Sequence, residues 1–375
     1  MFKIDVSTAF GIEAVTKREL AALGYNETAA VNGRITVEGG YDAIANLNLN
    51  LRTAERVFLQ IAKFKCETFD ELFENIKNIS IEDFVTQDAN IVINAKSAKS
   101  KLFALSAIQS ITKKAVCERL MKKFKTGALS ESGAQYCFEL AVMNDNATLS
   151  LDTSGAGLHK RGYRQMVGAA PLRETLAAAI INLSVFKWDK PLIDPFCGSG
   201  TIPIEAALIA QNIAPGLNRN FAFENWNNFP KHHIALAREN SRARIVSDRE
   251  LRISGFDIDP AAIKLANFHA EKAGVKVHFQ SQDMRKISSR YSYGVMIANP
   301  PYGERLMEEE KEIRLLYKDF YKVFKSFDNW SLYIITANRF LEKYFGEKAD
   351  KNRKIFNSQL ECKLYSYMGE KPKKF

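Results

Sequence analysis

Several features of specialised protein classes are missing from this chain of 375 residues. A membrane-spanning helix needs roughly 18–20 consecutive apolar residues, and the longest uncharged stretches, 175–186 and 206–218, are far shorter. The N-terminal sequence MFKIDVSTAF contains Asp5 and lacks the apolar core of a secretion signal. We therefore expect a cytoplasmic protein that does not insert into a membrane.

Cysteine and histidine are scarce, with 5 residues of each. The cysteine number is odd and no CxxC pair occurs, which is typical of a reducing compartment rather than of a disulfide framework. No HExxH motif occurs either, so we expect no metal site built by the protein. Hydrophobic residues make up 46% and charged residues 26% of the chain, which excludes a disordered or fibrous protein.

Acidic residues are fewer than basic ones, 43 against 53, which gives a net charge of +10. Residues after position 165 carry +8 of that excess. This balance favours a polyanionic partner, but it separates neither RNA from DNA nor an enzyme from a scaffold. The length predicts two or three domains.

The first half of the chain alternates strand and helix patterns. Thr68 followed by Glu71 is the pattern of a helix cap, MNDN at 143–146 predicts a hairpin turn, and 51–64 is predicted to begin as a helix and continue as a strand. The other expected strands and helices are 2–7, 11–25, 33–39, 68–79, 89–97, 106–127 and the two arms of 136–155. We expect this α+β half to be a binding or scaffolding unit.

The second half alternates short apolar runs with helical patterns. Such alternation predicts βαβ units on a parallel sheet that is covered on both faces. The expected strands are 191–196, 252–259, 276–281, 293–301, 331–338 and 360–369, and the expected helices are 173–186, 200–214 and 265–274. We therefore predict a doubly wound α/β domain.

Acidic residues follow three successive strands of that predicted sheet. Asp194 precedes the glycine turn Gly198–Gly200, Asp257 ends the next strand, and Asp283 follows the third. Ligands bind at the carboxyl ends of strands in open α/β sheets, and glycines let the backbone approach a ligand closely. A carboxylate there suits a cationic group, both hydroxyls of a ribose, or an amino group.

The sequence Asn299-Pro300-Pro301-Tyr302-Gly303 follows a fourth strand. Neither proline has an N–H group, so this stretch cannot continue the sheet ladder. It presents two acceptors to an amino group, the side-chain oxygen of Asn299 and the carbonyl of Pro300. Tyr302 offers a flat face on which a base can stack, an interaction worth roughly 1–3 kcal/mol.

These segments resemble the motifs of a known enzyme family. DPFCGSGT (194–201), GFDID (255–259), QDM (282–284) and NPPYGER (299–305) look like motifs I to IV of class I S-adenosylmethionine-dependent amino-methyltransferases. The first half, with LHKRGYR (158–164) and PLRET (171–175), resembles THUMP-containing RNA methyltransferases, above all the bacterial large-subunit (23S) rRNA guanine-N2 methyltransferases.

The resemblance implies four parts of the chain. They are a ferredoxin-like α+β subdomain at 1–55, a THUMP-like RNA-binding domain at 56–154, a connector at 155–170, and at 171–375 a Rossmann-like methyltransferase domain with a mostly parallel seven-stranded sheet. The implied cofactor is S-adenosyl-L-methionine, and the implied partner is structured RNA, with 23S rRNA favoured and tRNA possible.

The resemblance also assigns roles to individual residues. Asp194 and the glycine turn are expected beside the methionine moiety, Asp257 at the ribose and Asp283 at the adenine amine. The full set of expected cofactor contacts is Thr175, Asp194, Pro195, Phe196, Cys197, Gly198, Ser199, Gly200, Thr201, Asp257, Ile258, Asp283, Met284 and Asn299. The expected catalytic residues are Asn299, Pro300, Pro301 and Tyr302. No Cys/His pairing supports Cys197 as a nucleophile.

The predicted activity is methyl transfer to the exocyclic N2 amine of a guanine in RNA, most simply 23S rRNA. Three alternatives stay open on the sequence: a tRNA guanine-N2 methyltransferase, an adenine-N6 methyltransferase that acts on DNA or RNA, and an RNA-binding assembly factor without catalysis. The intact Asn-Pro-Pro-Tyr motif argues against the last of these.

One helix pattern, 106–127, is strongly basic. It is either a solvated face or a phosphate-binding surface. The expected RNA contacts are Lys113, Lys114, Lys122, Lys123, Lys125, Arg161 and Arg164, and Arg238, Arg242, Arg244 and Arg249 would extend them. The aromatic segment 218–230 is expected to pack in a core, or else to close over the site or stack on bases.

Overall fold

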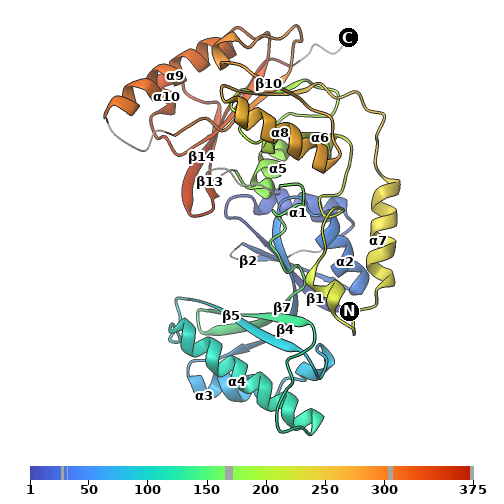
Figure 1. Cartoon of the computed structure of the whole chain (residues 1–375). Coiled ribbons are helices and arrows are strands. Elements are labelled where there is room, and N and C mark those ends of the chain that lie inside the picture. The colour runs from blue at the N-terminus through green and yellow to red at the C-terminus, as the bar shows by residue number, and fades with distance from the viewer. Residues whose placement is uncertain (27–28, 32, 165–171, 303–306, 372–375) are drawn as a thin grey trace.

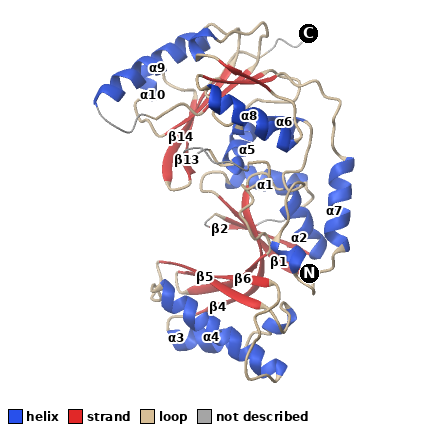
Figure 2. Ribbon diagram, viewed as in Figure 1, coloured by secondary structure: helices blue, strands red, loops and turns tan. Residues whose placement is uncertain are grey.

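The computed structural model describes residues 1–26, 29–31, 33–164, 172–302 and 307–371. Two seven-stranded sheets organise these residues, one in each half of the chain (Figure 1). Figure 2 shows helices packed along both sheets. Residues 165–170 of the expected connector, Pro171, and Gly303–Arg305 of the fourth motif lie outside the described residues. No described helix is long and apolar enough to cross a membrane.

The first sheet has the strand order β2-β3-β1-β4-β7-β6-β5. Its strands are β1 (Phe2–Thr8), β2 (Ala29–Val31), β3 (Arg34–Gly39), β4 (Ala54–Lys65), β5 (Asn90–Ala98), β6 (Gln135–Met143) and β7 (Asn146–Asp152). The helices of this half are α1 (Glu13–Ala22), α2 (Tyr41–Asn50), α3 (Phe69–Lys77), the short η1 (Ile81–Asp83) and α4 (Leu105–Phe124).

Strand β4 joins the two N-terminal units into one sheet. It is 12 residues long; its first part pairs with β1, from Ala54 to Gln60, and its second with β7, from Phe58 to Lys65. The prediction that 51–64 begins as a helix was wrong. Strand partners on both edges complete the backbone hydrogen bonds of this segment, and this pairing overrides a helical pattern of side chains.

Local signals in this half are confirmed. The backbone N–H of Glu71 donates to the Thr68 hydroxyl at 3.2 Å, and that of Thr68 donates to the Glu71 carboxylate at 3.3 Å, which forms the expected capping box. Asn144 and Asp145 have φ of 51° and 58°. Positive φ at both positions is what a tight turn between β6 and β7 requires, and Asn and Asp tolerate it well.

The second sheet has the order β10-β9-β8-β11-β12-β14-β13, and its first five strands are parallel. Its strands are β8 (Leu192–Asp194), β9 (Ile253–Asp257), β10 (His278–Ser281), β11 (Val295–Ala298), β12 (Ser331–Thr336), β13 (Lys351–Asn357) and β14 (Leu360–Tyr367). The predicted doubly wound α/β fold is confirmed. Strand β13 was not predicted, because its first four residues are exposed and polar and show no alternation.

Helices cover this sheet on both faces, as Figure 1 shows. They are α5 (Glu174–Leu183), α6 (Thr201–Ala210), α8 (Pro260–Ala273), α9 (Met307–Lys325) and α10 (Leu341–Phe345), with the short η3 (Met284–Lys286). Helix α7 (His232–Ala243) and the short η2 (Ala222–Asn225) pack instead against α2 and β6 of the first half. Parallel strands need such crossover connections, which place helices on the sheet faces.

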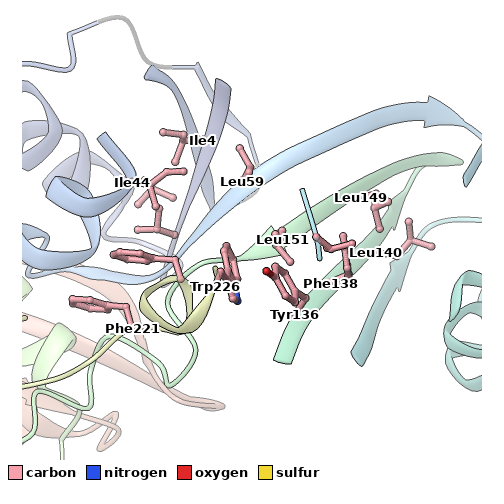
Figure 3. Packing of buried hydrophobic residues seen from close by; sticks show 14 of the residues in the cluster. Ile4, Ile44, Leu59, Tyr136, Phe138, Leu140, Leu149, Leu151, Phe221 and Trp226 are labelled. Atoms are coloured by element: carbon pink, nitrogen blue, oxygen red, sulfur yellow. The ribbon is translucent and has the colours of Figure 1, made fainter. Parts of the chain in front are cut away.

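The aromatic segment 218–230 belongs to the second half in sequence but to the first half in space (Figure 3). The ring of Trp226 stacks on Tyr136 of β6 with 4.8 Å between centroids, and its indole N–H donates to the Gln135 carbonyl at 3.0 Å. Phe221 and Phe229 are buried in the same core as the N-terminal strands. Core packing is therefore its role, and the two halves share a hydrophobic core.

Candidate active site

The turn after β8 is held by backbone hydrogen bonds to its neighbour β9. The N–H of Cys197 donates to the Phe256 carbonyl at 2.9 Å, and the N–H of Gly200 donates to the Cys197 carbonyl at 2.8 Å. The carboxylate of Asp194 accepts from the N–H of Phe196 at 3.0 Å. These bonds fix the first carboxylate and the glycine turn at the carboxyl end of the sheet.

Two glycines in this turn serve different needs. Gly200 has φ of +85°, and a Cβ there would lie 2.8 Å from the ring of Phe279, so both the backbone angle and the packing exclude a side chain. Gly198 has φ of +51° and open space where a Cβ would be. Its N–H donates to Asp257 at 2.9 Å, which ties the turn to the acid at the end of β9.

A cavity of about 440 Å³ opens beside this turn. Its walls come from the turn, the start of α8 and the end of β11, and the lining residues are Leu172, Asp194, Phe196, Cys197, Gly198, Ser199, Thr201, Ile202, Asp259, Ala261, Ala262, Leu265 and Asn299. Seven residues that the sequence predicted as cofactor contacts therefore meet at one cavity: Asp194, Phe196, Cys197, Gly198, Ser199, Thr201 and Asn299.

Asp194 is the buried acid of the cavity. It is 1% exposed, and burial raises the pKa of its carboxyl well above the usual range, with nearby Asp257 adding to the effect. No basic side chain within the described ranges forms an ion pair with it. A buried acid without a cationic partner beside a cavity fits a ligand that carries an amino group. Burial also raises the pKa of the Cys197 thiol, so this sulfur stays protonated and is not a nucleophile.

Other predicted cofactor residues are not among those that line the cavity. Pro195, Gly200 and Met284 are buried, and Ile258 is 72% exposed at the end of β9. Asp283 caps η3 through the N–H of Arg285 at 2.9 Å and pairs with the guanidinium of Arg285 at 3.1 Å. These hydrogen bonds, the backbone one foremost, lower the pKa of Asp283 and keep it an ionised acceptor.

Thr175 does not line the cavity. It is fully buried, and its hydroxyl donates to the carboxylate of Glu55 at 2.6 Å. The structure therefore places this residue at the contact between α5 and the N-terminal half.

The Asn-Pro-Pro-Tyr segment follows β11 directly. The hydroxyl of Tyr302 donates to the side-chain oxygen of Asn299 at 2.6 Å, and the Tyr317 hydroxyl donates to the Pro301 carbonyl at 3.3 Å. Pro300 is buried and Pro301 is exposed. Because an amide oxygen has two lone pairs, Asn299 can accept from Tyr302 and from a second donor together.

Sequence reasoning missed two residues that shape the site. Asp259 lines the cavity and caps α8 by accepting from the N–H of Ala261 at 2.8 Å. His269, fully buried on α8, contacts the Ser199 carbonyl through Nδ1 at 3.1 Å. Burial lowers the pKa of His269, so the neutral ring donates this hydrogen bond from Nδ1. Asp259 before a proline is a helix-cap signal in the sequence; His269 gives no such signal.

The expected RNA contacts at Arg161 and Arg164 are corrected by the structure. Arg161 is 2% exposed and pairs with the buried Glu205 of α6 at 3.4 Å. Arg164 pairs with Glu174 at 3.2 Å and donates to the hydroxyl of Thr201 in the cavity wall. Arg161 is held between the two halves, where it also donates to the Arg52 carbonyl, and Arg164 is held within the second half, so ion pairs inside the protein occupy both guanidiniums.

The basic helix α4 divides into paired and free cations. Lys113 pairs with Glu131 at 3.0 Å and Lys123 with Glu82 at 3.6 Å, while Lys114 lies over the ring of Phe73. Lys122 and Lys125 are exposed and form no ion pair within the described part of the chain. The free charge of α4 is therefore concentrated at its C-terminal end.

The arginines expected to extend this surface are mostly in structural contacts. Arg238 pairs with Glu224 at 2.7 Å, Arg244 donates to Asn50 at 3.1 Å, and Arg249 donates to the Ala210 carbonyl. These three are held by contacts within the protein, although Arg244 is exposed, as is Arg242.

Three sequence families match the chain along most of its length. They are described as "RMKL-like, methyltransferase domain" over residues 161–366, "RlmL ferredoxin-like domain" over 3–58 and "THUMP domain" over 66–152. The chain belongs to the RMKL-like methyltransferases. This is a class I S-adenosylmethionine-dependent group, and the resemblance noted in the sequence is thereby confirmed.

Curated relatives agree with this family. YpsC of Bacillus subtilis (strain 168), named as a candidate RNA methyltransferase, is 42% identical over 98% of this chain and 96% of its own. The ribosomal RNA large subunit methyltransferase K/L of Psychromonas ingrahamii is 33% identical over 98% of this chain. The chain spans about 50% of the length of that K/L protein.

Solved structures show the same fold over the whole chain. The candidate methyltransferase SMU.472, crystallised with S-adenosylhomocysteine, is 38% identical with a TM-score of 0.94 and covers 99% of both chains. A protein of Listeria monocytogenes, named as an N6-adenine-specific DNA methylase, is 43% identical with a TM-score of 0.94, over 98% of this chain and 96% of that one. The relatives of this RMKL-like methyltransferase are thus named for different substrates.

Proposed function

We propose that this protein transfers the methyl group of S-adenosylmethionine to the exocyclic N2 amine of a guanine in large-subunit ribosomal RNA. The observation that carries the proposal is the position of Asn299, whose amide lines the cavity that Asp194 and the glycine turn form. The THUMP domain and the K/L relative support RNA, and ribosomal RNA in particular, as the substrate.

The residues around the cavity fit this cofactor. The buried carboxyl of Asp194 suits the cofactor's ammonium group, and the open side of Gly198 leaves room for its methionine part. Asp257 accepts N–H groups of Gly198 and Asp259 and keeps one lone pair on each oxygen for ribose hydroxyls. We assign the adenine amine to the ionised carboxylate of Asp283.

The chemistry follows from the groups that face the cavity. S-adenosylmethionine supplies an activated sulfonium methyl when it is bound. The N2 lone pair of guanine is delocalised into the ring, so the amine is a poor nucleophile. Hydrogen bonds from its N–H groups to the Asn299 oxygen and the Pro300 carbonyl would turn the nitrogen toward tetrahedral geometry. They would also point its lone pair at the methyl group, in line with the bond that breaks. Neither oxygen is a base, so the released proton passes to solvent.

Tyr302 has two parts in this proposal. Its hydroxyl holds the Asn299 amide at 2.6 Å, which sets the direction of the acceptor oxygen before substrate arrives. Its ring offers a face to the target base. Preorganised acceptors of this kind lower the barrier because they need no rearrangement during the reaction.

The test is to incubate the purified protein and tritiated S-adenosylmethionine with unmodified large-subunit rRNA, tRNA and DNA in parallel. We expect label in rRNA, and mass spectrometry of the digested nucleosides should identify N2-methylguanosine. Label in an adenine nucleoside, or in tRNA or DNA alone, would refute the proposed substrate.

A further inference from the structure

A second cavity, of about 450 Å³, shares no lining residue with the cavity at the glycine turn. It is formed where the loop after β1, the residues before α5 and the β13–β14 hairpin meet, and it is lined by Ala9, Phe10, Glu55, Arg173, Lys354, Phe356 and Ser358. Figure 1 shows this hairpin reaching from the catalytic sheet toward the N-terminal half. The cavity therefore lies between the ferredoxin-like domain and the methyltransferase domain.

Phe10 is the unusual residue of this cavity. It is 63% exposed, and its ring meets Phe356 edge-on with 5.7 Å between centroids. The loop that carries it is fixed: Arg353 donates to the Gly11 carbonyl at 3.0 Å, and a Cβ on Gly11 would lie 2.5 Å from the Lys354 carbonyl. A rigid, exposed aromatic ring is what a nucleic-acid base needs for stacking.

Positive charge surrounds the two rings. Lys354 and Lys363 are directly opposite each other in the hairpin register, although like charges at such positions destabilise a sheet. Glu361 pairs with Lys354 at 2.7 Å, and the pKa of Glu361 is lowered by Lys354 first and also by Arg339 and Lys363. One carboxylate therefore stands among three cations.

This charged surface continues to the methyl-transfer site. Asn338 donates to the Tyr302 carbonyl at 3.3 Å, and the next residue, Arg339, is exposed and close enough to Glu361 to affect its pKa. At the other end, Arg173 neutralises Glu55 at 3.3 Å. A chain of neighbouring groups thus leads from Tyr302 through Arg339 and the hairpin to Phe10.

We propose that this surface holds the RNA strand next to the target nucleotide, with one base against Phe10 and Phe356 and the flanking phosphates at Arg339 and Lys363, beside the Lys354–Glu361 ion pair. Charges on β13 also protect an edge strand from pairing with other proteins. Edge protection, however, explains neither an exposed Phe10 in another part of the chain nor the Lys354–Lys363 opposition. The inference rests on the proposed RNA substrate but not on which nucleotide is methylated.

The test measures binding of a fluorescent single-stranded RNA octamer by anisotropy, so it does not depend on methyl transfer. We expect Phe10→Ala to weaken binding roughly fivefold to tenfold. We expect Lys354→Gln with Lys363→Gln to lower the slope of log affinity against log salt by about one unit for each phosphate that is no longer bound. The matched control is Lys276→Gln, an exposed lysine beside β10 at the opposite edge of the same sheet, and it should bind like the wild type.

Two further measurements separate the possible outcomes. Affinity for S-adenosylmethionine, measured by calorimetry, should be unchanged in all three variants, which shows that the fold and the cofactor cavity are intact. If the wild type binds the octamer and the Phe10 and lysine variants bind it equally well, the inference is overturned. A protein partner would then be the alternative occupant of this surface. If RNA is methylated at a nucleoside other than guanosine N2 and the variants still lose octamer binding, the proposed function fails and this inference stands.

Discussion

Backbone hydrogen bonds hold the turn at the cavity proposed for the cofactor, whereas side chains on scattered elements form the surfaces proposed for RNA. Around the cavity, the turn after β8 is bonded to β9, and Asp257 holds the N–H of Gly198. On α4 and on the β13–β14 hairpin, the available groups are exposed lysines, and the loop after β1 adds the exposed ring of Phe10. A rigid cavity favours binding of a small ligand because little conformational freedom is lost when the ligand enters. A long polyanion is instead held by the sum of many weak contacts.

That contrast predicts that single changes at the cavity act strongly and single changes on the surfaces act weakly. Asn299→Ala should give the largest effect, a loss of roughly 10²–10³-fold in the rate of methyl transfer, because it removes the acceptor that aims the amine. Cofactor affinity measured by calorimetry should stay within a few-fold of the wild type.

Asn299→Asp is the matched control, since it keeps an oxygen in the same place and should keep part of the transfer rate. A large loss of cofactor affinity in Asn299→Ala would show that this side chain binds the cofactor instead of the substrate.

The second largest effect is expected at Asp194. Asp194→Asn should weaken S-adenosylmethionine binding by roughly tenfold to a hundredfold, because a hydrogen bond to a charged group is worth about 1.5–3 kcal/mol. Thermal stability without cofactor should not fall, because the raised pKa shows that burial disfavours the ionised carboxyl. Calorimetry and thermal melts check the two statements.

The same residue predicts a pH dependence with a definite sign. A raised pKa means that the folded protein favours the protonated Asp194, so this group's contribution to stability is present at low pH and lost as pH rises through the raised pKa. A cationic ligand favours the ionised form, so cofactor affinity of the wild type should fall as pH is lowered. Asp194→Asn should show a flatter pH profile; an equally steep one would assign the titration to another group.

A smaller effect is expected at the glycine turn. Gly200→Ala should lower the free energy of unfolding by about 1–2 kcal/mol, because an L residue is strained at φ of +85° and its Cβ would press on Phe279. Gly198→Ala is the matched comparison, because it has the backbone strain of a positive φ but no close contact for the added Cβ. Urea unfolding should show a larger loss for Gly200→Ala, and equal losses would mean that packing against Phe279 is not limiting.

The smallest effect is expected on α4. Replacing Lys122, Lys123 and Lys125 with Gln should weaken RNA binding modestly and reduce its salt slope by about one unit for each phosphate that these side chains neutralise. Lys123→Gln alone should contribute little, because Glu82 already pairs with this side chain. An unchanged salt slope in the triple variant would mean that α4 is a solvated face that does not contact phosphates.

The sequence alone determined the parts of this protein that depend on local chemistry. Strand and helix periodicity in the second half predicted the doubly wound fold, and glycines, prolines and acids placed after strands marked the cavity, because the ends of parallel strands must meet at one edge. The capping box at Thr68 and the turn at Asn144 were equally local and equally predictable.

Only the tertiary structure decided which charges are free and which elements pair. Arg161 and Arg164 look like phosphate ligands in the sequence, but Glu205 and Glu174, which lie further along the chain, bury them as ion pairs. Strand β4 is fixed by partners on both edges, and Phe10 meets Phe356 across almost the whole chain. Such contacts depend on long-range packing, and no local pattern of residues encodes them.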